Sequence, residues 1–560
     1  MTGAPIVHTP SAYENPLLIK HIFGSAMNLA SDQEIVHAGR RRFTYREFGE
    51  RVHRLASALS DIGVRAGQTV AVMDWDTPRY LECFFAVPMM GAVLHTVNVR
   101  LSPEQILYTV NQADDDVILL NAEFVPVLEQ IWDRVDPGKK LVLLNDTAHK
   151  PATHLSFAGE YEALLAVADP DYPFPELDED TRATTFFTTG TTGLPKGVYF
   201  SHRQLVLHTL AVGMALSGPG HGRFNTGDVY MPMTPMFHVH AWGLPYIATL
   251  AGVKQIYPGR YVPDSLVNLI GQERVTFSHC VPTILQMVMA AAKKHEVSLR
   301  GWKVVIGGAA LAHPLARHAL EEGIDLFTGY GLSETCPILT LSHMKPHMEE
   351  WDIDRQVGVR CLTGRTIPMV QIRIVDEAMD DLPHDGQSSG EIVARAPWLT
   401  QGYLKDPANS DKLWAGGWLH TGDLATIDKD GYLKITDRLK DVIKTGGEWV
   451  SSIDIEDLLL THDSVAEAAV IGVPDEKWSE RPMAIVVVEP GKHVTQPELR
   501  TYLRDFAGRG VISTYAVPEH IVFIDELPKT SVGKIDKKFL RGKYAQSNPT
   551  SSKIIQGELR

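Results

Sequence analysis

The stretch that decides the fold runs from Thr188 to Lys196 and reads TTGTTGLPK. It follows residues 183–187, whose threonines and phenylalanines predict a strand. The glycines let the backbone turn and present N–H groups to oxyanions, while four threonine hydroxyls and the Lys196 amine add further donors. The spacing differs from GxxxxGK[ST], the pattern of nucleotide-kinase phosphate loops. We therefore predict a phosphate-binding loop of another kind and not a simple polar surface turn.

Short β-branched runs alternate with helix-length segments on both sides of this loop. A helix is expected at 78–90, and strands are expected at 69–73, 92–98, 116–120, 303–306, 324–327 and 371–375. Strands separated by helices predict parallel sheets with helical crossovers, in an α/β fold.

A second domain is expected after the charged segment Asp437–Lys444. Helices are predicted there at 453–460 and 496–508, and strands at 468–473, 483–488 and 521–524. This segment is about 120 residues long, an ordinary size for one domain. We therefore predict a large N-terminal domain of mixed sheets, residues 1–437, and a small, mobile α+β domain, residues 438–560, joined by a hinge.

Composition excludes several classes of protein. The 560 residues carry a net charge of −15, which disfavours binding to nucleic acid or to anionic lipid over most of the surface. The four cysteines form no CxxC pair, so neither a zinc site nor a disulfide framework is indicated. Val229–Val253 lacks charged side chains but contains three prolines and two histidines, which favours a pocket wall over a membrane span. We found no signal peptide and expect a cytoplasmic protein.

Several motifs together resemble the adenylate-forming superfamily, which includes acyl-CoA synthetases, luciferases and peptide-synthetase adenylation domains. The loop Thr188–Lys196 resembles its signature. The other motifs follow in order: YGLSET at 330–335, with Ser333 where threonine is usual, TGD at 421–423, DRLKD at 437–441, KTGGE at 444–448 and PKTSVGKI at 528–535. The resemblance, to bacterial fatty-acyl-CoA synthetases in particular, spans about residues 20–545. It implies ATP-dependent activation of a carboxylic acid to acyl-AMP with release of pyrophosphate, followed by transfer to CoA.

The resemblance also assigns residues to ATP. Tyr330 would stack on adenine, Asp423 would bind the ribose hydroxyls, and Thr188 with Glu334 would hold Mg²⁺. The ATP- or AMP-binding set is Thr188, Thr189, Gly190, Thr191, Thr192, Gly193, Lys196, Gly308, Ala309, Ala310, Thr328, Gly329, Tyr330, Gly331, Ser333 and Asp423. The catalytic set is Lys534, Glu334, Arg438 and Lys440. Lys534 would contact the α-phosphate and the substrate carboxylate, and Lys440 would be the pivot of the hinge.

The acid and the thiol are assigned in the same way. The acyl pocket is expected to include His238, Val239, Trp242, Gly243 and Trp449. His238 stands where amino-acid-adenylating domains usually carry aspartate, which disfavours an amino acid. Trp449 resembles the gate tryptophan of bacterial fatty-acyl-CoA synthetases, so a medium- or long-chain fatty acid is favoured. CoA is assigned to Lys444, Gly446, Gly447, Glu448 and Arg481.

Three alternatives remain open from the sequence. The acid could be short or aromatic, since close relatives that act on methylmercaptopropionate share the tryptophan motif. The acyl acceptor could be a carrier protein, although no carrier domain follows Lys534. A catalytically dead scaffold is the third alternative, and Lys534, Glu334 and Asp423 argue against it. The resemblance also suggests a homodimer, with the N-terminal segment as a contact.

Overall fold

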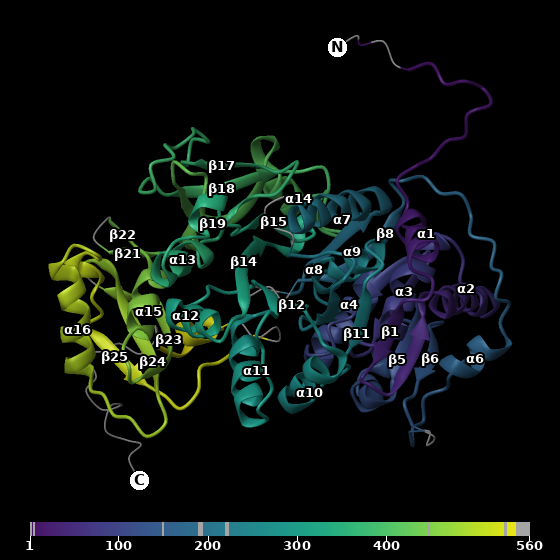
Figure 1. Cartoon of the computed structure of the whole chain (residues 1–560), viewed down its shortest axis with the longest axis horizontal. Helices are drawn as coiled ribbons and strands as arrows, with labels where there is room; N and C mark the ends of the chain where they lie inside the picture. The colour runs from purple at the N-terminus through teal and green to yellow at the C-terminus, as the bar shows by residue number, and fades with distance from the viewer. Residues whose placement is uncertain are drawn as a thin grey trace.

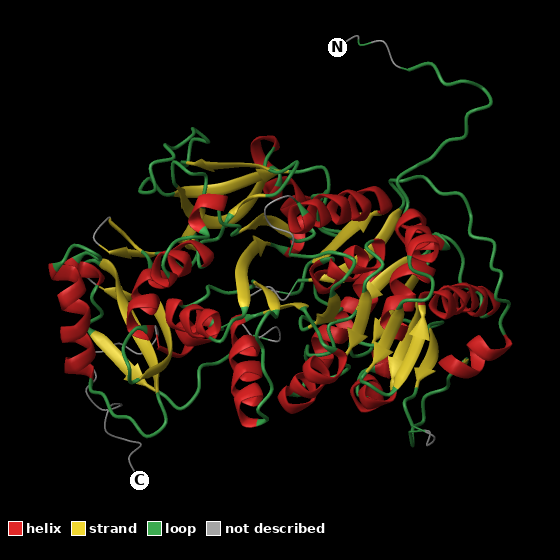
Figure 2. Ribbon diagram, viewed as in Figure 1, coloured by secondary structure: helices red, strands yellow, loops and turns green. Residues whose placement is uncertain are grey.

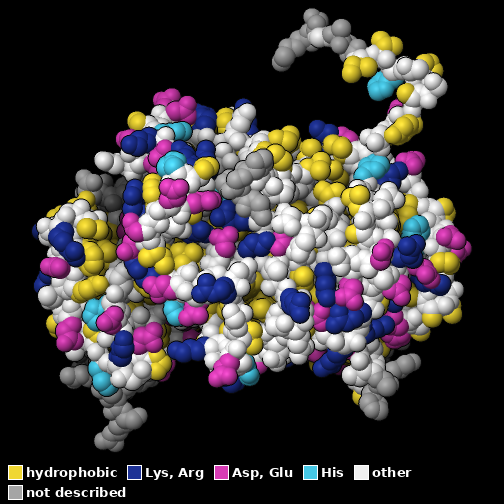
Figure 3. Space-filling view, viewed as in Figure 1, with side chains coloured by type: hydrophobic (Ala, Val, Ile, Leu, Met, Phe, Trp, Pro, Cys, Tyr) yellow, Lys and Arg dark blue, Asp and Glu magenta, His cyan; other side chains and the backbone are white. Residues whose placement is uncertain are grey.

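A computed structural model of the chain describes residues 3, 6–147, 151–188, 194–218, 223–445, 448–475, 477–530 and 535–544; of Glu448 and Trp449 it describes the backbone. The polypeptide folds into a large N-terminal domain, purple to green in Figure 1, and a smaller C-terminal domain at its left end. Both combine helices and strands (Figure 2), as the sequence predicts. Basic and acidic side chains are interspersed over the visible face (Figure 3).

A seven-stranded sheet forms the first layer of the large domain. Its strands are, in spatial order, β7 (Gly159–Glu160), β6 (Lys140–Leu144), β5 (Asp115–Asn121), β3 (Thr69–Met73), β4 (Val93–Thr96), β8 (Arg182–Phe187) and β9 (Gly197–Ser201). All pairs are parallel except β8–β9. Because the antiparallel β8–β9 pair flanks the phosphate loop, the loop joins the ends of two adjacent strands.

A nine-stranded sheet forms the second layer. Its strands are, in spatial order, β16 (Arg365–Thr366), β15 (Ile338–Leu341), β14 (Asp325–Gly331), β13 (Lys303–Ile306), β12 (Phe277–Cys280), β10 (Val229–Pro232), β11 (Lys254–Tyr257), β1 (Glu34–His37) and β2 (Arg41–Thr44). The central strands from β14 to β1 are parallel. Their carboxyl ends therefore meet at one edge of the sheet, where ligands bind in open α/β folds.

Apolar helix faces fill the space between the sheets. Helices α1, α3, α7 and α9 contact one another there and share one large core with both sheets, including the buried Phe84, Phe85 and Tyr246. Helices α10, α11 and α12 cover the other face of the nine-stranded sheet. The helices of this domain are α1 (Ile19–Leu29), α2 (Tyr45–Asp61), α3 (Pro78–Met89), α4 (Pro103–Ala113), α5 (Val125–Glu129), α6 (Tyr161–Val167), α7 (His202–Ser217), α8 (Val239–Trp242), α9 (Leu244–Leu250), α10 (Pro263–Glu273), α11 (Pro282–Lys294), α12 (His313–Glu321), α13 (Ile353–Arg360) and α14 (Pro407–Leu413).

A third, four-stranded sheet corrects one expectation. Its strands are β17 (Gln371–Val375), β18 (Gly390–Arg395), β19 (Leu419–Ile427) and β20 (Leu433–Arg438). The run 371–375 is a strand as predicted, but it lies in an antiparallel meander rather than in a parallel sheet. The segment that joins β17 to β18 contains no helix, so it lacks the crossover that a parallel connection needs.

The C-terminal domain has its own hydrophobic core, built around Ile455, Val470 and Leu499. Its elements are β21 (Ile443–Thr445), β22 (Glu448–Val450), α15 (Ser452–Leu460), β23 (Val465–Asp475), β24 (Ser479–Val488), α16 (Gln496–Gly508), β25 (His520–Phe523) and α17 (Lys537–Tyr544). In the part of the chain that is described, every helix falls short of the length and apolar character needed to cross a membrane.

Candidate functional site

The base of the phosphate loop is closed by two hydrogen bonds. The Thr188 amide donates to the Lys196 carbonyl at 2.9 Å, and the Lys196 amide donates to Thr188 Oγ1 at 3.3 Å. Both residues extend the antiparallel β8–β9 pair. The predicted ligands Thr189, Gly190, Thr191, Thr192 and Gly193 lie outside the described residues.

Tyr403, which sequence analysis did not single out, links this loop to Glu334. The Lys196 Nζ lies 4.4 Å from the centroid of the Tyr403 ring, and the Tyr403 hydroxyl donates to Glu334 Oε1 at 2.7 Å. Tyr403 stands in the turn-rich stretch GYLKDP at 402–407. An aromatic residue among turn formers was the one signal available, and it indicates a fixed loop rather than a role.

The segment 328–331 is strand, not a turn. The strand expected at 324–327 is longer than predicted, because β14 continues to Gly331 and pairs with β15. Gly331 fits only because it lacks a side chain, since a Cβ there would lie 1.7 Å from the Pro337 carbonyl oxygen. The hydroxyl of Thr328 donates to the Leu362 carbonyl, so it already has a partner. The following single turn, Ser333–Thr335, carries Glu334.

Asp423 is the centre of a second polar group. Its side chain is 4% exposed, Oδ2 accepts from the Tyr330 hydroxyl at 2.9 Å, and Oδ1 lies 3.1 Å from Arg438 Nε. The backbones of Asp423 and Arg438 face each other in the β19–β20 ladder. Burial opposes the charge of Arg438, but the neighbouring carboxylates, Asp423 above all, hold its pKa above its usual value. Three residues assigned to ATP or catalysis are therefore joined.

The hinge segment lies directly after these residues. β20 ends at Arg438, and β21 of the small domain begins at Ile443. Partial burial and the charge of Arg438 lower the pKa of Lys440. Asp441 forms an ion pair of 2.6 Å with Arg541 of α17.

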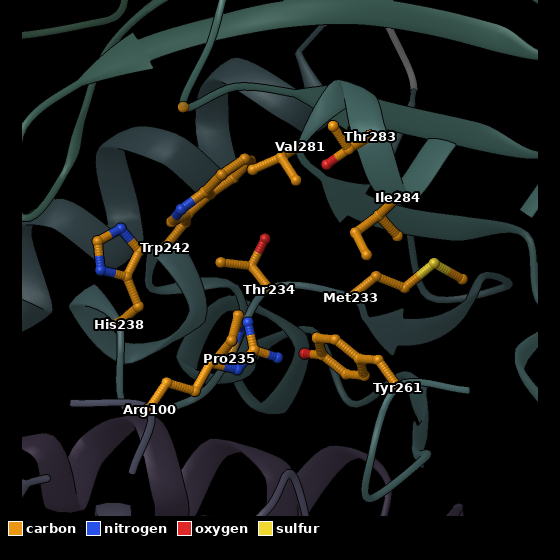
Figure 4. A pocket seen from close by; sticks show the side chains of 11 residues that line it. Arg100, Met233, Thr234, Pro235, His238, Trp242, Tyr261, Val281, Thr283 and Ile284 are labelled. Atoms are coloured by element: carbon orange, nitrogen blue, oxygen red, sulfur yellow. The ribbon is translucent and has the colours of Figure 1, made fainter. Parts of the chain in front are cut away.

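A cavity opens at the carboxyl ends of the parallel strands β10 to β13 (Figure 4). Its cavity volume is about 70 Å³, which is below the scale of a pocket for a drug-sized ligand. Its lining residues are Arg100, Met233, Thr234, Pro235, His238, Trp242, Tyr261, Val281, Thr283, Ile284 and Gly308. Three of the predicted residues, His238, Trp242 and Gly308, thus border one cavity.

Two of the predicted acyl-pocket residues do not line it. Residues 239–243 form a left-handed turn, with φ between 49° and 75° at every residue. Val239 is 1% exposed and packs in the large core. Gly243 closes the turn, and a Cβ there would meet the His208 ring at 2.8 Å. Val239 therefore packs in the core beside this cavity, Gly243 suits the backbone of the turn, and their place in an acyl pocket stays a prediction.

The cavity wall also contains polar residues that sequence analysis missed. Tyr261 lines the cavity and donates a hydrogen bond to the buried Asp76, which also accepts from the Met236 amide at 2.9 Å. Burial raises the pKa of Asp76 to about 7. Arg100 lines the same cavity and lies 5.9 Å from the Phe237 ring centroid. These residues come from separate loops, so only the fold brings them together.

The CoA candidates lie on adjacent strands of the small domain. The Lys444 amide donates to Glu480 Oε2 at 3.0 Å, and Arg481 pairs with Glu519 at 3.1 Å. Gly446 and Gly447 lie outside the described residues, as do the side chains of Glu448 and Trp449. Lys534 also lies outside them.

Family models match most of the chain. One described as "AMP-binding enzyme" matches residues 24–404, and one described as "AMP-binding enzyme C-terminal domain" matches residues 454–534. The two matches correspond to the two domains of the fold.

Known proteins resemble the chain over nearly its whole length. A long-chain-fatty-acid–CoA ligase of Thermus thermophilus is 40% identical over 91% of this chain and 92% of its own length. A 3-methylmercaptopropionyl-CoA ligase of Ruegeria lacuscaerulensis is 37% identical over 94% of this chain and 97% of its own. The solved structure of an anthranilate CoA ligase with anthranoyl-AMP shares the fold, with a TM-score of 0.82 at 22% identity, over 94% of this chain and 98% of that one.

Proposed function

Because the chain belongs to the AMP-binding enzyme family, we propose that it is an AMP-forming acid–CoA ligase that activates a medium- or long-chain fatty acid. The observation that carries the proposal is the contact of Tyr403 with both Lys196 and Glu334. It brings two motifs that are 138 residues apart in sequence, the phosphate loop and the YGLSET segment, to one place.

In the first half-reaction the substrate carboxylate attacks the α-phosphorus of ATP, and pyrophosphate leaves. Both reactants are anionic, so the site must present aimed donors and cations. Lys196 and the donors of the loop hold the phosphates. Asp423 accepts hydrogen bonds from the ribose hydroxyls, and Arg438 lies beside the ribose and the phosphates. Tyr330 supplies an aromatic face for adenine, next to the backbone at Gly308, Ala309 and Ala310. Lys534 neutralises charge at the α-phosphate.

Mg²⁺ is expected to accompany ATP, and the residues present fit it. In the described part of the chain, no cluster of three or more His, Cys, Asp or Glu side chains could hold a metal. Mg²⁺ bound with ATP takes most of its ligands from phosphates and water. Glu334 Oε1 accepts from Tyr403, and Glu334 Oε2, with Thr188 Oγ1, would complete the set. The ion would neutralise phosphate charge.

In the second half-reaction the CoA thiol attacks the acyl carbon of acyl-AMP, and AMP leaves. Rotation of the small domain about the hinge between residues 437 and 444, with Lys440 as pivot, would move Lys534 away from the site and bring the β21–β22 hairpin to it. The domain division at 437/438 is supported by the separate core of the small domain. Lys444, Arg481 and the glycine pair 446–447 are the proposed CoA contacts, with Glu448 in the same hairpin.

The proposal of a fatty acid as substrate is supported by the lining of the cavity and by the similarity to known ligases. Trp242, Met233, Pro235, Val281 and Ile284 give it apolar walls, as a hydrocarbon requires. Trp449 is proposed as its gate. The similarity to the Thermus long-chain ligase supports the same substrate class. The similarity to the methylmercaptopropionyl-CoA ligase keeps a short acid as the second candidate, favoured by the polar side of the wall.

Two further properties are proposed with the function. A cytoplasmic location is proposed because ATP and CoA are both consumed. A homodimer is proposed because Ile6, Val7 and Tyr13 are 82–91% exposed in the N-terminal segment, which leaves apolar side chains for a second subunit to cover.

A panel of acids tests the proposal. Pyrophosphate release and acyl-CoA formation are measured with saturated acids of increasing length, methylmercaptopropionate, benzoate and an amino acid, each with and without CoA. We expect the highest kcat/KM with medium or long chains and acyl-CoA as the product. Preference for methylmercaptopropionate would favour the second candidate. Transfer only to a pantetheinyl carrier protein, or no acid-dependent release, would refute the ligase.

A further inference from the structure

We propose that Tyr403 is a positioning residue. It holds the Glu334 carboxylate and the Lys196 amine at a fixed position relative to each other, so that Glu334 can bind the metal ion while Lys196 contacts the phosphates of the same ATP. The inference rests on the proposed function, because it takes Glu334 as a magnesium ligand and Lys196 as a phosphate contact. In this proposal Tyr403 acts through the side chains of Glu334 and Lys196.

The backbone around Tyr403 is fastened on both sides. On the phosphate-loop side, Tyr403 bridges to Val198 of β9, and the Leu404 amide donates to the Gly197 carbonyl at 2.8 Å. On the other side, the Thr400 amide donates to the Glu334 carbonyl at 3.0 Å. The segment 400–404 therefore spans from the strand after the loop to the turn that carries Glu334.

The Tyr403 side chain also connects these two segments, because it contacts both Glu334 and Lys196. Its hydroxyl donates to one carboxylate oxygen, Glu334 Oε1, at 2.7 Å, which restrains the carboxylate and leaves Oε2 for a metal ion. Its ring face lies 4.4 Å from Lys196 Nζ. An ammonium above an aromatic face still has N–H donors that point away from the ring and can reach phosphate oxygens. One side chain thus orients both charged groups.

The backbone amide of Tyr403 donates to Ser410 Oγ at 2.8 Å, so the loop can keep its path when the hydroxyl is removed.

Two substitutions separate the two contacts. Tyr403→Phe removes the bond to Glu334 and keeps the ring beneath Lys196. Tyr403→Leu removes both. The matched control is Tyr432→Phe, which removes a buried hydroxyl that donates to the His343 carbonyl at 2.8 Å, near the far end of β20 from Arg438.

Binding is measured on the full-length protein without acid or CoA. Mn²⁺ is titrated by electron paramagnetic resonance in the presence of α,β-methylene-ATP, and metal-free AMP and pyrophosphate are titrated by calorimetry. For Tyr403→Phe we expect Mn²⁺ affinity to fall about 10- to 100-fold, as for loss of a bond that orients a metal ligand, with AMP affinity unchanged. Tyr403→Leu should in addition weaken metal-free pyrophosphate about two- to fivefold, the size of an exposed cation–π contact.

A double-mutant cycle distinguishes positioning from general damage. In a Glu334→Gln background, Tyr403→Phe should weaken Mn²⁺ binding no further. Additive losses, or an equal loss of AMP affinity in Tyr403→Phe, would overturn the inference, as would a loss of Mn²⁺ affinity in Tyr432→Phe of the same size. Failure of every acid in the panel would refute the ligase and leave these binding results standing. A wild-type protein that binds no Mn²⁺ with the analogue would overturn both.

Discussion

Asp423→Asn changes the charge of one buried side chain while it keeps its shape. In the free protein the two oxygens of Asp423 already accept from Tyr330 at 2.9 Å and face Arg438 at 3.1 Å. Asparagine can still accept from Tyr330 through its one oxygen. The variant loses the charged acceptor that we propose for the ribose hydroxyls.

The two losses differ in size. A hydrogen bond to a charged group contributes about 1.5–3 kcal/mol, so the KM for ATP should rise about 10- to 100-fold. The Arg438 side chain is 37% exposed, so loss of its ion pair should lower the free energy of unfolding by about 1 kcal/mol or less. A large effect on ATP with a small effect on stability is therefore expected.

The assay pairs pyrophosphate-release kinetics with urea unfolding. Asp228→Asn is the matched control, because Asp228 is 5% exposed and pairs with Lys303 at 2.5 Å, at the opposite, amino ends of β10 and β13. That control should lose stability and keep its KM for ATP. An unchanged KM in Asp423→Asn, or a fall in stability as large as the loss of ATP binding, would refute the assignment to the ribose.

Three further predictions concern separate parts of the chain. Lys534→Ala should slow acyl-AMP formation about 10²- to 10³-fold and spare thioester formation from supplied acyl-AMP, with Lys538→Ala as control; equal loss of both half-reactions would contradict it. Asp76→Asn should abolish a pH dependence of stability, because the folded-state pKa of Asp76, about 7, exceeds the unfolded value of about 3.8. The free energy of unfolding of the wild type relative to the variant should therefore fall as pH rises from 4 to 7, by up to about 4 kcal/mol, and then level off. Urea-unfolding profiles of the two proteins that run parallel across this pH range would count against the prediction. Gly331→Ala should prevent native folding, judged by circular dichroism and soluble yield, because its Cβ would overlap backbone, whereas Gly508→Ala, with open space around it, should be tolerated; two similar unfolding midpoints would show that β14 can shift.

The sequence predicted the local elements well and the cavity poorly. The strands at 69–73, 303–306 and 371–375 and the helix at 496–508 have the bounds expected, because their β-branched runs and capping residues act locally. The expectation that 371–375 lies in a parallel sheet was wrong, since the direction of pairing depends on the connection to the next strand and not on the residues within the strand.

Long-range contacts account for the features that the sequence could not give. His238 and Trp242 belong to one apolar segment and were found there, but Arg100, Tyr261 and Asp76 come from loops of two different sheets. Tyr403 meets Glu334 across 69 residues of chain. Contacts of that kind depend on packing between elements, which no local pattern encodes.

The left-handed turn at 239–242 has a consequence for how an acid would bind. Four successive residues other than glycine in this conformation cost roughly 1–2 kcal/mol each, so the surrounding core must hold the turn in place at all times. Trp242, packed with its ring centroid 5.1 Å from that of His279, is thereby immobilised before any ligand arrives. An incoming acyl chain would contact a pocket wall that is already ordered, and little binding free energy would be spent on ordering the protein. Selectivity between chain lengths should then vary in steps, as each methylene meets a rigid surface, rather than grading smoothly.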